Sequence, residues 1–255
     1  MKTPTHILRN LMTGFLCLTL GLNACKKDTP DKIDQPTQSD YLLSETYQNG
    51  TLVSKHYYNG KNQVERTELY MDGEVSGETT YSYDDQNRLY LERMESNEVT
   101  IENKFEYNNG AILKVENRSN GDLISTSTYS YSGNTITMQV EVLTGLSYTH
   151  TYIKENGNIV KEEAKFPDFP IANWTLVRSD FDEGRSLSFS MDPYSFTSRN
   201  NPGREIRTTE TPGGTYNWRW EYRYNSEGYL TGCTSYDYET GELVDDFEYK
   251  LIPAK

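Results

Sequence analysis

The aromatic residues near the C-terminus are the side chains best suited to bind a ligand. They occupy every second position of one short segment: Tyr216, Trp218, Trp220, Tyr222 and Tyr224. In an extended strand, residues at this spacing all project from the same face. Such a row of rings offers stacking surfaces for the apolar C–H faces of sugars, and Trp174 could join it. The same pattern is typical of the packed face of a strand, so the sequence leaves both interpretations open.

Two groups of acidic residues could supply oxygen ligands for a calcium ion. One lies at 180–183 and the other in a predicted turn at 84–87. Neither has the number of ligands found in an EF-hand-type loop, so we interpret both as solvated turn residues and expect no metal or other cofactor. A glycoside hydrolase needs two carboxylates placed across the scissile bond. Nothing singles out such a pair among 38 acidic residues, and a hydrolase is our third hypothesis.

Motifs for nucleophilic, metal and nucleotide chemistry are missing from the sequence. There is no Gly-x-Ser-x-Gly, His-Glu-x-x-His, Cys-x-x-Cys or phosphate-binding glycine loop. His56 and His150 lie in strand patterns beside aromatic residues, and Cys233 has no histidine motif near it. We predict that all three are structural, with Cys233 a small buried apolar residue. The sequence therefore predicts a protein that is not an enzyme.

The overall charge disfavours one class of partner. The chain of 255 residues has 25 Lys+Arg against 38 Asp+Glu, a net charge of -13. Phosphate backbones are bound by basic surfaces. We therefore expect no nucleic-acid partner.

The N-terminus has the features of a secretory signal peptide over residues 1–24. Lys2 and Arg9 precede an apolar segment of about a dozen residues, which is too short to span a bilayer. Residues 22–25, Leu-Asn-Ala-Cys, resemble the lipobox of bacterial lipoproteins. The resemblance implies that Cys25 is acylated and that palmitate-type chains anchor the protein to the outer membrane, on its periplasmic face or at the cell surface. Residues 25–40 are polar and charged, so we expect a flexible tether.

The remaining chain, 41–255, has the pattern of an antiparallel β domain. Glycine and asparagine turn signals recur every 10 to 14 residues between Gly50 and Gly157, and several are Asn-Gly or Asp-Gly pairs that favour tight hairpins. Aromatic residues also recur at intervals of 23 or 24, at Tyr57, Tyr81, Phe105, Tyr129 and Tyr152. The repeating unit is therefore one β-hairpin of about 24 residues.

The regular pattern breaks in the middle of the domain. Phe166 to Pro170 interrupts the alternation, and residues 167–203 are expected to form an irregular excursion before strands resume near Arg204. Counting the regular segments gives roughly 14–17 short strands, and a sheet of that size must curl or close to bury its edges. The predicted fold class is all-β, a single antiparallel meander that is strongly curved or closed into a barrel.

Three segments carry a resemblance to a known repeat. Residues 83–89, Tyr-Asp-Asp-Gln-Asn-Arg-Leu, resemble the signature of YD repeats, which are RHS-like, and residues 107–112 and 224–230 are looser copies. The whole β domain resembles a family of Bacteroidota lipoproteins of unknown function. That resemblance implies a porin-like barrel or curved β-meander, and it implies no particular activity.

A membrane-spanning barrel is an alternative that the strand lengths allow. Against it, the apolar face mixes Tyr with Ser and Thr, whereas a lipid-facing band is rich in Leu and Val. Our first functional hypothesis is a non-catalytic envelope lipoprotein that acts as a binding module, with polysaccharide as the proposed ligand. The second is a structural envelope protein that contacts other proteins through its sheet edge or its acidic face.

Overall fold

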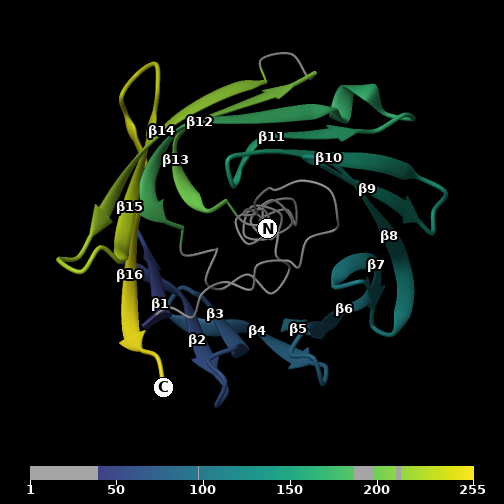
Figure 1. Ribbon diagram of the computed structural model, residues 1–255, viewed down its shortest axis with the longest axis horizontal. Helices are drawn as coiled ribbons and strands as arrows, with labels where there is room; N and C mark the ends of the chain where they lie inside the picture. The colour runs from purple at the N-terminus through teal and green to yellow at the C-terminus, as the bar shows by residue number, and fades with distance from the viewer. Residues whose placement is uncertain (1–39, 97, 187–197, 211–213) are drawn as a thin grey trace, which may run out of the picture.

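A computed structural model describes residues 40–96, 98–186, 198–210 and 214–255. These residues form one closed barrel in which each strand pairs antiparallel with its neighbours in sequence and β1 pairs with β16 (Figure 1). The elements are β1 (Tyr41–Gln48), β2 (Thr51–Tyr58), β3 (Val64–Met71), β4 (Glu74–Tyr83), β5 (Leu89–Ser96), β6 (Val99–Asn108), β7 (Ala111–Ser119), β8 (Asp122–Ser132), β9 (Thr135–Val142), β10 (Ser147–Glu155), β11 (Asn158–Lys165), the 3-10 turn η1 (Pro170–Ala172), β12 (Trp174–Arg185), β13 (Asn200–Thr209), β14 (Thr215–Tyr224), β15 (Leu230–Asp237) and β16 (Leu243–Pro253).

The all-β meander predicted from the sequence is confirmed, and its sheet closes. The predicted signal peptide at 1–24, the predicted acylation site Cys25 and all of the predicted tether except Asp40 lie outside the described residues. The described part contains no helix long and apolar enough to cross a membrane.

The expected irregular excursion at 167–203 is wrong for much of its length. It contains η1, the 12-residue strand β12 and the first residues of β13. The prolines that suggested a break fit the sheet in two ways: Pro170 opens η1, and Pro202 lies opposite Phe181, beside a β-bulge. Proline is tolerated at such bulges because the ladder of hydrogen bonds is already interrupted there.

The turns at one end of the barrel explain the recurring Asp and Asn residues. In the turn after β4, the Asp84 carboxylate accepts hydrogen bonds from the backbone amides of Gln86 and Arg88, at 2.9 and 2.8 Å. Asn59 and Asn225 make the same two bonds in their turns. Three residues after each of these caps, the backbone takes a positive φ, at Asn62, Asn87 and Gly228. The side chain thus caps a turn that only Gly, Asn and Asp adopt readily.

Tyrosine hydroxyl groups connect the two strands of each of the first four hairpins. Each donates a hydrogen bond to a backbone carbonyl near the start of the preceding strand: Tyr58 to Leu43, Tyr83 to Val64, Tyr107 to Leu89 and Tyr131 to Ile112, at 2.7 to 3.0 Å. We call this series the tyrosine ladder. A buried tyrosine needs such a partner, so the regular spacing of these residues follows from the repeat of the hairpin.

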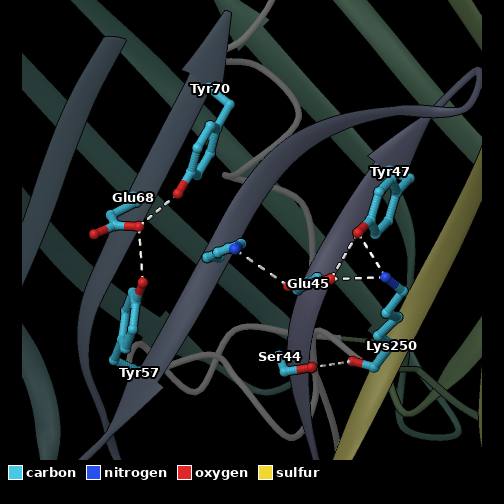
Figure 2. A network of polar contacts seen from close by, with 8 residues as sticks. Ser44, Glu45, Tyr47, Tyr57, Glu68, Tyr70 and Lys250 are labelled. Atoms are coloured by element: carbon cyan, nitrogen blue, oxygen red, sulfur yellow. Dashed lines mark hydrogen bonds and ion pairs between the residues drawn. The ribbon is translucent and has the colours of Figure 1, made fainter. Parts of the chain in front are cut away.

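The two faces of the barrel wall differ in chemistry. One face holds a core of Leu89, Phe105, Ile112, Val115, Ile136 and Ile159, with tyrosines packed against it. Figure 2 shows side chains of the other face at β1, β2, β3 and β16, standing on the side away from the opposite wall. That outer face is charged, and its carboxylates are hydrogen bonded by tyrosines and bases. The core face is therefore the inner face of the barrel.

Glu68 illustrates how the outer face is organised (Figure 2). Its carboxylate accepts hydrogen bonds from the hydroxyls of Tyr70 at 2.7 Å and Tyr57 at 2.8 Å, and Arg66 lies 2.5 Å away. These donors lower the pKa of Glu68 to about 2. The carboxylate of Glu45 likewise accepts hydrogen bonds from Tyr47 and Lys250, and these lower its pKa to about 2. These two outer carboxylates are therefore held as paired anions at neutral pH.

The seam between β1 and β16 closes the sheet. Lys250 of β16 lies 2.9 Å from the Glu45 carboxylate of β1, and Gln48 donates to Asp245 at 2.6 Å. The amide of Asn49 also donates to the Asp246 carbonyl at 2.7 Å. Every described strand has a neighbour on both sides, so this part of the sheet has no free edge strand of the kind that the second hypothesis used.

Candidate functional site on the inner wall of strands β10 to β14

The aromatic residues singled out in the sequence lie on the inner wall. Tyr216, Trp218, Trp220, Tyr222 and Tyr224 share the inner face of β14, and Trp174 lies on β12, two strands away. Tyr216 and Trp218 stack in parallel, with ring centroids 5.7 Å apart and an interplanar angle of 7°. Tyr216 is 52% exposed. Of the five aromatic residues of β14, these two therefore offer the surface on which a ligand ring could stack.

The other three aromatic residues of β14 are engaged by polar groups. The indole N–H of Trp220 donates to Glu205 at 2.9 Å, and the hydroxyl of Tyr222 donates to the Pro202 carbonyl at 2.8 Å. The Tyr224 hydroxyl is hydrogen bonded to Asp182 and accepts from Asn201. These contacts and the burial of Tyr222 make this half of β14 part of the packed wall. The row predicted from the sequence is therefore divided between two roles.

Further aromatic and basic side chains join Tyr216 and Trp218 from the neighbouring strands. Tyr148 and Phe166 stack at 4.8 Å, and the ring of His150 meets the edge of Trp174 at 5.1 Å. The Arg207 guanidinium lies over the Trp174 ring at 4.8 Å. We define the aromatic patch as the set Tyr148, His150, Phe166, Trp174, Arg207, Tyr216 and Trp218. It lies towards the end of the barrel opposite the end at which β1 begins and β16 finishes.

A buried ionic row lies beside the patch. The guanidinium of Arg178 on β12 reaches Glu162 of β11 at 2.5 Å and Glu205 of β13 at 2.6 Å. The exposed fractions of the three side chains are 5%, 4% and 12%. Burying one cation between two anions requires this close pairing, because isolated charges lose too much hydration. We call Glu162, Arg178 and Glu205 the ionic row.

The ionic row connects to the patch at both sides. His150 Nε2 lies 3.3 Å from the Glu162 carboxylate, and His150 Nδ1 is hydrogen bonded to the Tyr152 hydroxyl at 3.1 Å. On the other side, Glu205 accepts the bond from Trp220. Burial opposes ionisation of Glu162, but Arg178 and His150 outweigh it and the pKa of Glu162 falls below its ordinary value. Glu162 is thus held as an anion.

All three buried side-chain polar atoms that lack a hydrogen-bond partner in the described residues lie in this region. They are Arg178 Nη2, Arg207 Nε and His150 Nε2, and the last of these still faces the Glu162 carboxylate at 3.3 Å. Arg207 also makes no ion pair with any carboxylate of the described part. Unsatisfied buried polar atoms are rare and cost roughly 1–3 kcal/mol each. Because these atoms lie together on β10, β12 and β13, this part of the wall is the candidate site for a polar ligand.

The ionic row was not predicted from the sequence. Glu205 looks like an ordinary charged strand residue, and Arg178 lies in the segment that was expected to be irregular. The one available signal was alternation: Trp174, Leu176 and Arg178 occupy every second position, which places Arg178 on the face that Trp174 shares.

Most of the other candidate residues have structural roles. Asp182 accepts from the backbone amides of Gly184 and Asn201, both at 3.0 Å, and Asp84 caps its turn. No group of three or more His, Cys, Asp or Glu side chains in the described residues is arranged to hold a metal ion. His56 is a buried strand residue between Ser54 and Thr67, and burial lowers its pKa to about 4.

Cys233 is buried, as predicted. Its thiol contacts the Tyr249 hydroxyl at 3.2 Å. Burial raises the pKa of the thiol to about 11, so it is protonated at neutral pH. This thiol is therefore not poised to act as a nucleophile.

Comparisons with known proteins bear on the fold. No model of a known protein family and no curated protein sequence matches the chain. Among solved structures, a porin-like protein from Bacteroides vulgatus superposes with a TM-score of 0.56 at 12% identity, over 84% of this chain and 100% of that one. A porin-like protein from Bacteroides uniformis gives a TM-score of 0.51 at 13% identity, over 85% of this chain and 100% of that one. At such identities the likeness shows that this chain shares the barrel fold of these porin-like proteins.

Proposed function

We propose that the protein is a non-catalytic binding module of the cell envelope and that it binds glycans at the aromatic patch. The observation that carries the proposal is the parallel pair of Tyr216 and Trp218, with Tyr216 half exposed, beside the Arg207 guanidinium, which makes no hydrogen bond or ion pair to a side chain among the described residues. Flat rings bind the apolar faces of sugars, and nearby N–H groups bind their oxygens. Both kinds of group occur together on the inner wall of β10 to β14.

The ionic row supports a role without catalysis. A glycoside hydrolase needs a carboxylic acid whose pKa is raised so that it can donate a proton. Glu162 has a lowered pKa, and Arg178 holds both Glu162 and Glu205 in ion pairs. Carboxylates that are fixed in this way are poorly suited to protonate a leaving group. The hydrolase hypothesis therefore has little support from this pair.

An envelope location is supported by two observations of different kinds. The barrel is similar to porin-like proteins of Bacteroides, and the sequence predicts acylation at Cys25. The charged outer face favours a barrel in water, since burying Arg or Lys in a bilayer costs about 2–4 kcal/mol per residue. We therefore propose a lipid-anchored barrel that stands outside the hydrocarbon layer.

The anchor can be tested separately from the ligand. Cells grown with a palmitate analogue that carries an alkyne should label the wild-type protein, and Cys25→Ser should abolish the label and release the protein from the membrane fraction. Equal labelling of the two proteins would refute acylation at Cys25. That result would leave the binding hypothesis unaffected.

The binding proposal is tested by fluorescence of residues 40–255, which contain the whole barrel. With Trp174→Phe and Trp220→Phe in place, emission reports on Trp218 alone, and a panel of polysaccharides is added in the presence of acrylamide. We expect one glycan to protect Trp218 from quenching, and Tyr216→Ala to weaken that binding by roughly tenfold, the scale of one aromatic contact.

Tyr90→Ala is the matched control for this experiment. Tyr90 is similarly exposed, at 42%, but lies on β5, far from the patch in strand order. Its removal should leave glycan binding unchanged. Emission from a buried Trp218 that no glycan alters would refute the aromatic patch as a glycan site.

The alternative is a structural protein that contacts other envelope proteins. The turns at the end near the aromatic patch carry exposed apolar side chains, including Met71, Val99, Leu143, Phe169 and Leu243. Exposed apolar groups on several turns favour a protein contact. If no glycan binds, replacement of Leu143 and Phe169 by Ser should reduce crosslinking to envelope proteins in intact cells.

A further inference from the structure

We infer that the aromatic patch selects sugars that carry a carboxylate, and that Arg207 is the residue that binds this group. The inference rests on the proposed function, because it names the charge of the glycan for the same site. Three observations lead to it: the chemistry of the unpaired atoms, the position of Arg207, and the lack of an ion-pair partner for Arg207 among the described residues.

Two arginine nitrogens near the patch are donors without a hydrogen-bond partner among the described residues. Arg178 Nη2 and Arg207 Nε are N–H groups, which can only donate. Both atoms are buried, but the Arg207 side chain as a whole is only partly buried, so other N–H groups of its guanidinium can meet a ligand. A ligand of this guanidinium must present oxygens that accept hydrogen bonds, as hydroxyl and carboxylate groups do.

The two arginines lie on adjacent strands of the same face. Arg178 pairs with Glu205, and Arg207 of β13 pairs with Leu176 of β12. Arg178 and Arg207 are thus diagonal neighbours, a relation that places two residues of an antiparallel pair roughly 7–8 Å apart. A single sugar residue can span this distance.

The two arginines differ in how much charge remains for a ligand. Arg178 is neutralised by Glu162 and Glu205. Arg207 has no carboxylate within salt-bridge distance among the described residues, and its one described contact is with the face of Trp174. A guanidinium stacked on a ring keeps its edge N–H groups available in the plane that matches a carboxylate.

An aromatic surface that can stack on a sugar ring lies next to the Arg207 guanidinium. Arg207 lies opposite Tyr216 in the β13–β14 ladder, and Tyr216 stacks on Trp218. A uronic acid has the matching arrangement, because its carboxylate projects from the edge of a ring whose faces include apolar C–H groups. We therefore expect the sugar ring on Tyr216 and its carboxylate on Arg207.

The net charge of the chain opposes this ligand only at long range. The chain carries -13 overall, so an acidic polymer is repelled on approach. At physiological ionic strength such repulsion is screened beyond about 8 Å, whereas a contact with a partly buried guanidinium is screened much less. Binding is therefore measured at 0.15 M salt, with short oligosaccharides.

The test compares acidic oligosaccharides with neutral forms of the same sugars. Oligomers of galacturonate, mannuronate and hyaluronan are each paired with the carboxyl-reduced product, which has CH2OH in place of the carboxylate. Binding to residues 40–255 is followed by calorimetry and by Trp218 fluorescence. We expect at least one acidic oligomer to bind roughly tenfold or more tightly than its reduced form, the effect of one charge-assisted hydrogen bond.

Three variants assign the preference to Arg207. Arg207→Gln should remove the difference between the acidic and reduced oligomers, and Arg207→Lys should keep part of it. Arg204→Gln is the matched control, since Arg204 lies on the same strand but stacks on Tyr238 at the outer face. If Arg207→Gln fails to fold, the comparison of acidic with reduced oligomers on the wild-type protein still decides the ligand charge.

Each outcome distinguishes this inference from the function on which it rests. Equal binding of acidic and reduced oligomers, or an unchanged preference in folded Arg207→Gln, overturns the inference and leaves glycan binding intact. Binding of neutral glycans alone does the same. If no acidic, reduced or neutral glycan binds and Trp218 stays unaffected, both the inference and the proposed function are refuted.

Discussion

The first eight strands and the wall of β10 to β14 use the same hairpin architecture for different purposes. In β1 to β8, tyrosine hydroxyls reach backbone carbonyls, and polar side chains of the inner face such as His56 and Asn103 are hydrogen bonded to their neighbours. In β10 to β14, the inner face contains the ionic row, the stacked aromatic rings and three unpaired polar atoms. One half satisfies its own polar groups, and the other leaves some unsatisfied. Buried polar groups that lack a hydrogen-bond partner are characteristic of functional sites.

The comparison predicts that changes in the two halves have different consequences. Substitutions in the tyrosine ladder should lower stability and leave binding unchanged. Substitutions at Arg207 and Tyr216 should lower binding with little change in stability. A ladder variant that loses binding, or a patch variant that unfolds the protein, would contradict this division.

The largest expected effect comes from breaking the ionic row. Arg178→Met leaves Glu162 and Glu205 buried without a counter-charge, and removal of one partner from a buried ion pair costs roughly 3–5 kcal/mol of unfolding free energy. Urea unfolding followed by circular dichroism measures the loss. Adding Glu162→Gln and Glu205→Gln should restore more than half of it, because the uncompensated charges are then gone. A single Arg178→Met variant with wild-type stability would show that the row contributes little.

The turn at 84–88 provides the next largest effect. Asn87 has a φ of 62°, in the left-handed region, so Asn87→Ala should cost roughly 1–2 kcal/mol. Asn87→Gly adopts this backbone without strain and should be close to neutral. Thermal unfolding of both variants tests the point. Equal losses would indicate that the Asn87 side chain matters more than its backbone conformation.

The sequence predicted the regular half in much more detail than the patch. Asn-Gly turns and the 24-residue spacing of aromatic residues express local rules, so they identified the hairpins around Tyr81, Phe105 and Tyr129. Closure between β1 and β16 joins residues about 200 positions apart, and no local pattern encodes that pairing. Arg178 was missed for a related reason: its partners come from β11 and β13, and only the folded sheet brings them together.

A tyrosine of the ladder should have a moderate effect. Tyr107→Phe removes the hydrogen bond to the Leu89 carbonyl, which is 2.8 Å long, and leaves that acceptor without its donor. The expected cost is about 1 kcal/mol, with glycan binding unchanged. Tyr70→Phe, at the outer face, is the control and should cost less because water can replace the lost bond. A larger loss in Tyr70→Phe would reverse the assignment of inner and outer faces.

The smallest expected effect is the loss of stability in Glu68→Gln, and its dependence on pH compares an outer carboxylate with an inner one. Glu68 has a pKa of about 2 in the folded protein, against an ordinary value of 4.5. A depressed pKa stabilises the fold above pH 4.5, and this contribution disappears as the pH falls through the folded value. Glu68→Gln should therefore be less stable than wild type at pH 7, by less than about 1 kcal/mol because the site faces water. The difference should shrink between pH 4.5 and about 2, as followed by urea unfolding at each pH. Glu162→Gln, at the inner face, should lose more at pH 7, since Arg178 then keeps only one of its two buried anions. Equal losses from the two variants would mean that burial does not strengthen the ionic row, and the distinction between the two faces would fail.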